Sequence, residues 1–337
     1  MTLEDALIDW YKTNRRHLPW REDPTPYHVY LSETMLQQTQ VAKVLPYYER
    51  FLETYPTIES LAKASLPDIQ LLWQGLGYYS RAKNLLLGAK EIAASSSFPS
   101  TSEELLRIKG IGPYSEKAIR AIAFHQKAVA IDGNLIRVYA RLNADKDTNP
   151  NALKIKAETY LKRELHRQDP SAYNQALMDL GELICLPNGV PKCSLCPLSP
   201  FCKAEDLPNP ESFPFKAKKA KRKNVPLAIF LFRKEDSLFL SKRKDDGLLA
   251  GLYEYPNIEK EMSLEEVISF LLTKGIRFKW IKPLPPKTHV FSHLLWKMSP
   301  YLIEGASFVP FSGEWIKKED IGIKVALPTA FRKITLD

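Results

Sequence analysis

The sequence predicts a chain of two domains, an all-α domain followed by an α+β domain. Apolar residues follow a helical periodicity through residues 1–203, and a two-residue periodicity replaces it over residues 225–337. The length of 337 residues suits two domains at the usual size of about 100–200 residues each. Residues 204–224, between these two regions, have the composition of a linker.

The all-α prediction rests on spacing, caps and breaks. Apolar residues recur every three or four positions in 3–11 and again in 105–108. Thr57 and Thr101 each stand directly before a helical pattern, in a position typical of an N-cap. Proline-containing breaks separate the predicted helices, at residues 24–26, 55–57, 95–99 and 149–151.

The linker and the second domain differ in composition from the first. The linker ends in a basic run of Lys216, Lys218, Lys219, Lys221, Arg222 and Lys223. Such a run serves either as a solvated tether or as a contact for a nucleic-acid backbone. Residues 227–233 and 238–243, joined by a polar turn, predict a β-hairpin. A helix over 263–274, capped by Ser263, and further strands in 288–304 complete an α+β domain.

Charge and hydropathy favour a nucleic-acid-binding protein and disfavour a membrane or secreted one. The net charge of +9 and the pI near 9.1 are typical of nucleic-acid binders, although a basic protein without such a partner has the same balance. No run approaches the ~20 apolar residues of a membrane span. The first five residues carry acids where a secretory signal carries bases. We therefore expect a cytoplasmic protein with no membrane partner.

All four cysteines lie in one short segment. Gaps of seven, two and five residues separate Cys185, Cys193, Cys196 and Cys202. Such clustering disfavours a disulfide framework, and four thiolates in one loop suit either a tetrahedral zinc or a [4Fe–4S] cluster. A structural staple accounts for such a site without any redox function.

A glycine pair predicts a tight turn between two helices. Gly110 and Gly112 can adopt positive φ and bring the backbone close to a partner, and Pro113 is placed to open the next helix. The free N–H groups of such a turn suit a phosphate. As a bare pattern, this segment is equally typical of any helix–helix turn.

Four further stretches carry a family resemblance. Residues 18–21, 31–41, 75–82 and 174–181 resemble, in order and spacing, the MutY family of adenine DNA glycosylases within the helix-hairpin-helix, endonuclease III-like superfamily. The resemblance implies a helix-hairpin-helix over about 105–125 and one [4Fe–4S] cluster on the four cysteines. That family usually has six residues in the first cysteine gap, where this chain has seven. It also implies a monomer that binds double-stranded DNA containing adenine opposite 8-oxoguanine or guanine.

The resemblance also assigns functional residues in the first domain. It implies that Glu33, with a pKa raised by burial, protonates N7 of an extruded adenine. Asp132, kept ionised, would stabilise the cationic sugar, and Tyr114 and Asn134 would orient these groups. It implies base and DNA contacts at Trp20, Arg21, Leu36, Gln38, Tyr78, Gln175, Gly110 and Gly112. Without the family match, Glu33 would be an ordinary helix carboxylate and Asp132 a turn residue.

One substitution distinguishes activities within the superfamily. Bifunctional glycosylases of this type use a hairpin lysine as a Schiff-base nucleophile, and Tyr114 stands at that position here. The expected enzyme is therefore a monofunctional hydrolase. Two rivals remain: a bifunctional endonuclease III-type enzyme acting on oxidised pyrimidines, and a catalytically silent DNA-damage binder or redox-responsive cluster protein.

The second domain carries a resemblance of its own. Residues 288–293 resemble the loop with which the MutY family recognises 8-oxoguanine, which implies contacts from Phe291, Ser292 and His293. Residues 247–256 resemble the segment before a Nudix box, but the paired glutamates that would bind Mg²⁺ are missing. The segment therefore favours a Nudix-like fold kept for recognition, and the alternative is a purely structural domain.

Overall fold

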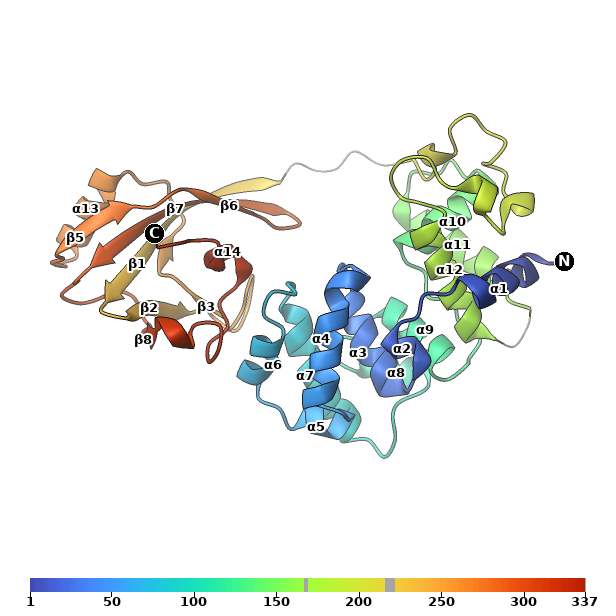
Figure 1. Cartoon of the computed structure of the whole chain (residues 1–337), viewed down its shortest axis with the longest axis horizontal. Helices are drawn as coiled ribbons and strands as arrows, with labels where there is room; N and C mark the ends of the chain where they lie inside the picture. Colours follow the sequence, from blue (N-terminus) through green and yellow to red (C-terminus); the bar gives the residue numbers. More distant parts are fainter. Residues whose placement is uncertain (167–168, 216–221, 337) are drawn as a thin grey trace. The chain divides into compact units, whose positions relative to one another are not determined.

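The computed structural model describes residues 1–166, 169–215 and 222–336. The chain forms two compact units, Met1–Lys63 with Leu87–Lys218 and Ala64–Leu86 with Lys219–Asp337 (Figure 1). Lys216, Lys218, Lys219 and Lys221 of the basic run lie outside the described residues. The boundaries 1–203, 204–224 and 225–337 stay a prediction.

The N-terminal region is helical, as its periodicity predicts. Its helices are α1 (Leu3–Asn14), α2 (Pro19–Glu22), α3 (Pro26–Leu36), α4 (Val41–Thr54), α5 (Ile58–Ala62), α6 (Leu66–Leu72), α7 (Ser80–Ala93), α8 (Ser102–Arg107), α9 (Pro113–Ile122), α10 (Gly133–Asn143), α11 (Pro150–Glu164) and α12 (Pro170–Leu183). Thr57 and Thr101 cap α5 and α8 with reciprocal capping boxes, which confirms both predicted helix starts. No described helix is long and apolar enough to cross a bilayer.

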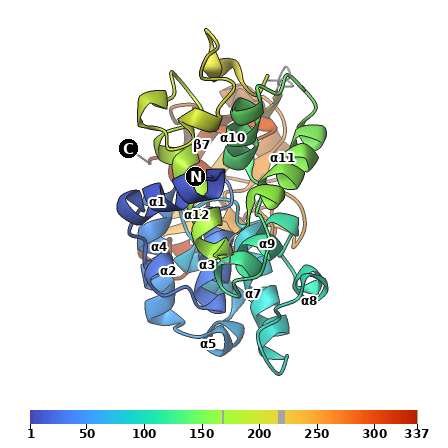
Figure 2. The same ribbon diagram turned by 90° about the vertical axis from the view of Figure 1, so that its right-hand side faces the viewer.

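Helix α12 is the centre of the first unit. It packs against α1, α9 and α10 (Figure 2), and most of its residues are buried. The side chain of Asn174 donates to the carbonyl of Ala128 at 2.9 Å and accepts from the amide of Ala130 at 2.9 Å. Because these bonds satisfy an extended segment that has no strand partner, they fix the chain just before Asp132.

The two glycines of the turn between α8 and α9 differ in backbone conformation. Gly110 has a φ of +88°, as expected for a tight turn, but Gly112 has a φ of −103° and a ψ of 179°. Gly112 does not use the positive φ that is open to glycine, because it is the N-cap of α9, where extended backbone is the usual conformation. Pro113 opens α9, as predicted.

The second unit contains a mixed sheet. Its strands are β1 (Lys223–Lys234), β2 (Ser237–Lys242), β3 (Tyr253–Glu254), β4 (Asn257–Ile258), β5 (Trp280–Pro283), β6 (Lys287–Val290), β7 (Leu294–Glu304) and β8 (Glu314–Lys317). Long strands β1 and β7 pair in parallel, and β1 and β2 form the predicted antiparallel hairpin. Strand β1 begins at Lys223, two residues before the period change expected at residue 225.

One helix covers each face of this sheet. Alternate residues of β1 point to opposite faces: Ile229 belongs to the same buried cluster as Phe331 of α14 (Thr329–Arg332), and Phe230 to the same cluster as Val267 of α13 (Leu264–Thr273). Ser263 caps α13, as predicted. The sheet is therefore buried on both faces, which explains the nearly continuous apolar run in β1.

Candidate active site

A cavity of about 330 Å³ opens in the first unit. It is lined by nine of the residues that the sequence predicts for the site, namely Trp20, Arg21, Glu33, Leu36, Gln38, Tyr114, Asp132, Asn134 and Gln175. They come from α2, α3, the turn after α3, α9, α10 with its N-cap, and α12. The fold therefore brings together side chains up to 155 positions apart, from Trp20 to Gln175.

Glu33 is a buried carboxyl at the cavity wall. It lies in α3 with 5% of its surface exposed, and the Tyr114 hydroxyl hydrogen-bonds to it. Burial raises the pKa of Glu33 to about 7, with a smaller upward contribution from Asp132; the bond from Tyr114 and the charge of Arg21 oppose the rise. Burial also raises the pKa of Tyr114 well above its usual value, so its hydroxyl remains a donor. Glu33 thus holds a proton to near-neutral pH.

Asp132 is both a cavity residue and a helix cap. Its carboxylate accepts the backbone N–H of Leu135 at 2.8 Å and the side-chain amide of Asn134 at 3.1 Å. Burial raises the pKa of Asp132, and these hydrogen bonds act in the opposite direction by favouring the charged form. The N-cap geometry fixes the direction in which the carboxylate points, independently of any ligand.

Asn134 continues this network away from the cavity. Its amide oxygen accepts from Arg137 at 3.0 Å, and Arg137 also donates to the carbonyl oxygens of Gly181 at 2.6 Å and Cys185 at 2.8 Å. A Cβ on Gly181 would lie 2.7 Å from that of Asn134, so only glycine allows α10 and α12 to approach this closely. The cysteine segment is therefore hydrogen-bonded, through two side chains, to the cap of α10.

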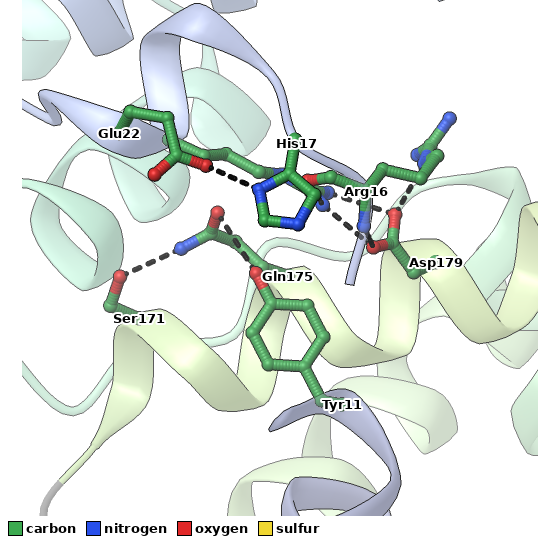
Figure 3. A network of polar contacts seen from close by, with 8 residues as sticks. Tyr11, Arg16, His17, Glu22, Ser171, Gln175 and Asp179 are labelled. Carbon is green, nitrogen blue, oxygen red and sulfur yellow. Dashed lines mark hydrogen bonds and ion pairs between the residues drawn. The ribbon is translucent and has the colours of Figure 1, made fainter. Parts of the chain in front are cut away.

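The wall formed by α12 contains residues that the sequence analysis did not single out. Asp179, fully buried, accepts from Arg16 at 2.6 Å and from Arg21 at 2.6 and 3.0 Å (Figure 3). Asp179 itself does not line the cavity, whereas Arg16, Met178 and Glu182 do. Ser171, Gln175 and Asp179 recur at every fourth position of α12, and this spacing, which places them on one face, was the available signal.

Trp20 and Gln38 occupy different settings at the cavity. Trp20 is buried and packs edge-on against Tyr48, with ring centroids 5.0 Å apart. Gln38 is exposed and has a φ of +57°, a conformation that costs a non-glycine residue free energy. Trp20 is thus a fixed part of the wall, whereas Gln38 projects its side chain towards solvent.

The four cysteines form one partly buried group. All are free thiols, and Cys185, Cys196 and Cys202 pack against the core around α12. Arg141 contacts the Sγ of Cys185 at 3.2 Å. Within 1–166, 169–215 and 222–336, no three His, Cys, Asp or Glu side chains are already arranged around a common metal position. The donor set itself, four soft sulfurs in one loop, fits an iron–sulfur cluster or zinc.

The remaining predicted residues lie outside the cavity. Phe291 is held between His289 and Trp296, at centroid distances of 4.6 and 4.8 Å, whereas Ser292 and His293 are exposed at the turn between β6 and β7. Tyr78, with a φ of +51°, places its hydroxyl 3.4 Å from that of Ser292. The other predicted residues outside the cavity are Gly110, Gly112 and the four cysteines.

Comparisons with known proteins agree with this architecture. A family model described as HhH-GPD superfamily base excision DNA repair protein matches residues 31–163, and a NUDIX domain model matches residues 228–336. A solved structure of a thermostable thymine-DNA glycosylase superposes with a TM-score of 0.52 at 27% identity, covering 60% of this chain and 94% of that one. The fold is thus a helix-hairpin-helix glycosylase domain with a C-terminal Nudix-like domain.

Two relatives show to which family the chain belongs. The chain is 37% identical over 297 residues to an adenine DNA glycosylase of Arabidopsis thaliana, an alignment covering 75% of this chain but about half (47%) of that relative's length. It is 33% identical over 304 residues to an adenine DNA glycosylase of Buchnera aphidicola subsp. Baizongia pistaciae, covering 88% of this chain and 85% of that relative. The chain therefore belongs to the adenine DNA glycosylase family of base-excision repair proteins.

Proposed function

We propose that the protein hydrolyses the N-glycosidic bond of adenine opposite 8-oxoguanine or guanine in double-stranded DNA and leaves an abasic site. One observation carries the proposal: Glu33, with a pKa near 7, and Asp132 line the same cavity. A protonated acid and a second carboxylate in one site are the usual arrangement for cleavage of a glycosidic bond. The names of the relatives support adenine as the base.

The chemistry begins with the base outside the duplex, because the glycosidic bond is hidden within the stack. Trp20 and Leu36 supply apolar walls for the base, and Glu33 donates its proton to N7. Adenine then leaves as a neutral molecule. The carboxylate of Asp132 stabilises the oxocarbenium-like sugar, and water completes the abasic site.

Two neighbours hold the acid and the carboxylate. The Tyr114 hydroxyl binds Glu33, and the Asn134 amide binds Asp132 at 3.1 Å. Gln38 and Tyr78 act as wedges in the duplex, while Gly110 and Gly112 approach the DNA backbone. Because a phenol at position 114 forms no Schiff base, the enzyme hydrolyses the bond without efficient strand cleavage.

Cys185, Cys193, Cys196 and Cys202 hold one [4Fe–4S] cluster in this proposal. Four free thiols, three of them packed on the core of the first unit, support it. The cluster supplies a cross-link for the segment 185–202 and takes no part in bond cleavage. Arg137 and Arg141 contact this segment and tie it to α10.

A single assay separates this function from its rivals. Duplex containing adenine opposite 8-oxoguanine is incubated with the full chain, with and without alkali. Alkali-dependent cleavage at adenine is the expected result. Alkali-independent cleavage would indicate a bifunctional enzyme, and binding without cleavage a damage binder. Glu33→Gln should lower excision by several orders of magnitude, at least about a thousandfold, with DNA affinity nearly unchanged. Equal loss of affinity and excision would mean that Glu33 is structural.

Recognition of the oxidised base is assigned to the turn between β6 and β7. Phe291 anchors this turn, which leaves Ser292 and His293 exposed to a ligand. His293→Ala should reduce the preference for 8-oxoguanine over guanine opposite the adenine, by roughly tenfold for the loss of a good base contact. Single-turnover excision from both duplexes measures the preference, with His125→Ala, in the first unit, as a control. An unchanged preference in the His293 variant would remove this turn from recognition.

A further inference from the structure

Helix α12 presents a buried polar stripe to the segment formed by α1 and α2. Ser171, Gln175 and Asp179 follow one another at intervals of four residues, and each is less than 10% exposed. Figure 3 shows all three side chains on the same side of the helix, facing Tyr11 and Arg16. Of the stripe, Gln175 alone is among the residues lining the cavity, and Ser171 hydrogen-bonds to it.

The amide of Gln175 is held at both ends. The Tyr11 hydroxyl donates to its Oε1 at 3.3 Å, and its Nε2 donates to the Ser171 hydroxyl at 2.9 Å. A phenol donates a hydrogen bond better than it accepts one, and an aliphatic hydroxyl accepts readily. Burial raises the pKa of Tyr11 and keeps that donor protonated. The two hydroxyls therefore favour one of the two amide orientations that differ by a half-turn.

Tyr11 is itself fixed in place. The Arg21 guanidinium lies 5.9 Å from the centre of the Tyr11 ring, and Arg21 forms two hydrogen bonds with Asp179, at 2.6 and 3.0 Å. Asp179 lies one helical turn beyond Gln175 on α12. Arg21, which lies beside the Tyr11 ring, is therefore bonded to the same helix that carries the Gln175 amide. If the Gln175 amide turned, the Tyr11 hydroxyl could move with it only by disturbing the contact between Tyr11 and Arg21.

We infer that Tyr11 and Ser171 are positioning residues that fix the orientation of the Gln175 amide and thereby decide which hydrogen-bonding edge of a purine the cavity accepts. After these two bonds, the amide keeps one N–H and one lone pair for a ligand. A half-turn of the amide would exchange the positions of this donor and this acceptor. The inference rests on the proposed function, since it concerns the base that the cavity takes up.

The test compares adenine with hypoxanthine, each opposite 8-oxoguanine in the same duplex. Hypoxanthine carries a carbonyl in place of the 6-amino group and a proton on N1. Donor and acceptor are therefore exchanged at these two positions, while N7 is unchanged. Tyr11→Phe keeps the ring beside Arg21 and removes only the hydroxyl, and Ser171→Ala removes the acceptor. Each should lower the single-turnover ratio of adenine to hypoxanthine excision by roughly three- to tenfold, and the double variant should lower it further.

Two controls separate positioning from general damage. Tyr27→Phe removes a buried phenol hydroxyl that donates to the carbonyl of Tyr55 at 2.7 Å, away from the cavity, and should leave the ratio unchanged. Ser171→Thr retains a hydroxyl and should restore the ratio. Parallel loss of both substrates in Tyr11→Phe and Ser171→Ala, with an unchanged ratio, would overturn the inference. Failure of the wild-type protein to excise adenine would instead overturn the proposed function.

Discussion

Glu33 shows how one buried carboxyl sets a working range of pH. Its pKa of about 7 lies well above the ordinary value of 4.5, chiefly because burial penalises the charged form. Between these two values the folded chain keeps a proton that the unfolded chain releases, so stability falls as the pH rises. The ionised carboxylate costs on the order of 3 kcal/mol of stability above pH 7.

The pH dependence of excision follows from the same group. Since the proposed acid must be protonated, the single-turnover rate should be level below about pH 6.5 and should fall roughly tenfold per unit above about pH 7.5. A rate profile on duplex with adenine opposite 8-oxoguanine measures this fall. A rate that stays constant to about pH 9 would exclude Glu33 as the proton donor.

Residues of the site differed in how far the sequence could predict them. Glu33, Tyr114 and Asp132 lie in stretches that resemble a family, and the fold brings all three to one cavity. The pairing of Arg16 with Asp179 could not be predicted, although Asp179 lies in the family-like stretch 174–181, because the ion pair joins residues 163 positions apart. A local pattern carries no information about such a partner.

At the scale of elements, the N-cap of α10 combines a structural and a proposed chemical task in Asp132. Asn caps a helix about as well as Asp, so Asp132→Asn should change the free energy of unfolding by less than about 1 kcal/mol. The variant lacks the charge that would stabilise a cationic sugar, and excision should fall by at least about a hundredfold. Urea unfolding and single-turnover excision measure the two effects. If stability and activity fall together, the carboxylate acts mainly as a cap.

Elements with local signals were predicted well. The capped helices α5, α8 and α13 and the hairpin of β1 and β2 have their start signals or turns within a few residues of chain. The conformation of Gly112 was not predicted, because either sign of φ is open to glycine and the choice depends on how α9 begins. The parallel pairing of β1 with β7 joins strands 71 positions apart, Lys223 with Leu294, and likewise left no local signal.

At the scale of the whole molecule, we expect thermal stability to depend on what binds the thiols of the segment 185–202. If a cluster cross-links the segment to the core around α12, Cys196→Ser should lower the bound iron and sulfide and reduce the melting temperature by roughly 5 °C or more. Ser194→Ala, in the same turn, serves as the control. Analysis of iron and sulfide with thermal unfolding tests this expectation. Undiminished iron in the Cys196 variant would show that this thiol is not a ligand.

The shared carboxylate of Asp179 has a consequence for how an anion meets the cavity. Arg16 and Arg21 both pair with the single carboxylate of Asp179, so the two guanidinium groups share one partner at this corner. Arg16 is the more accessible of the pair, with 23% of its side chain exposed. The bond to Asp179 already immobilises the Arg16 side chain. The entropy cost of ordering this cation is therefore met during folding, and binding of a phosphodiester does not add it.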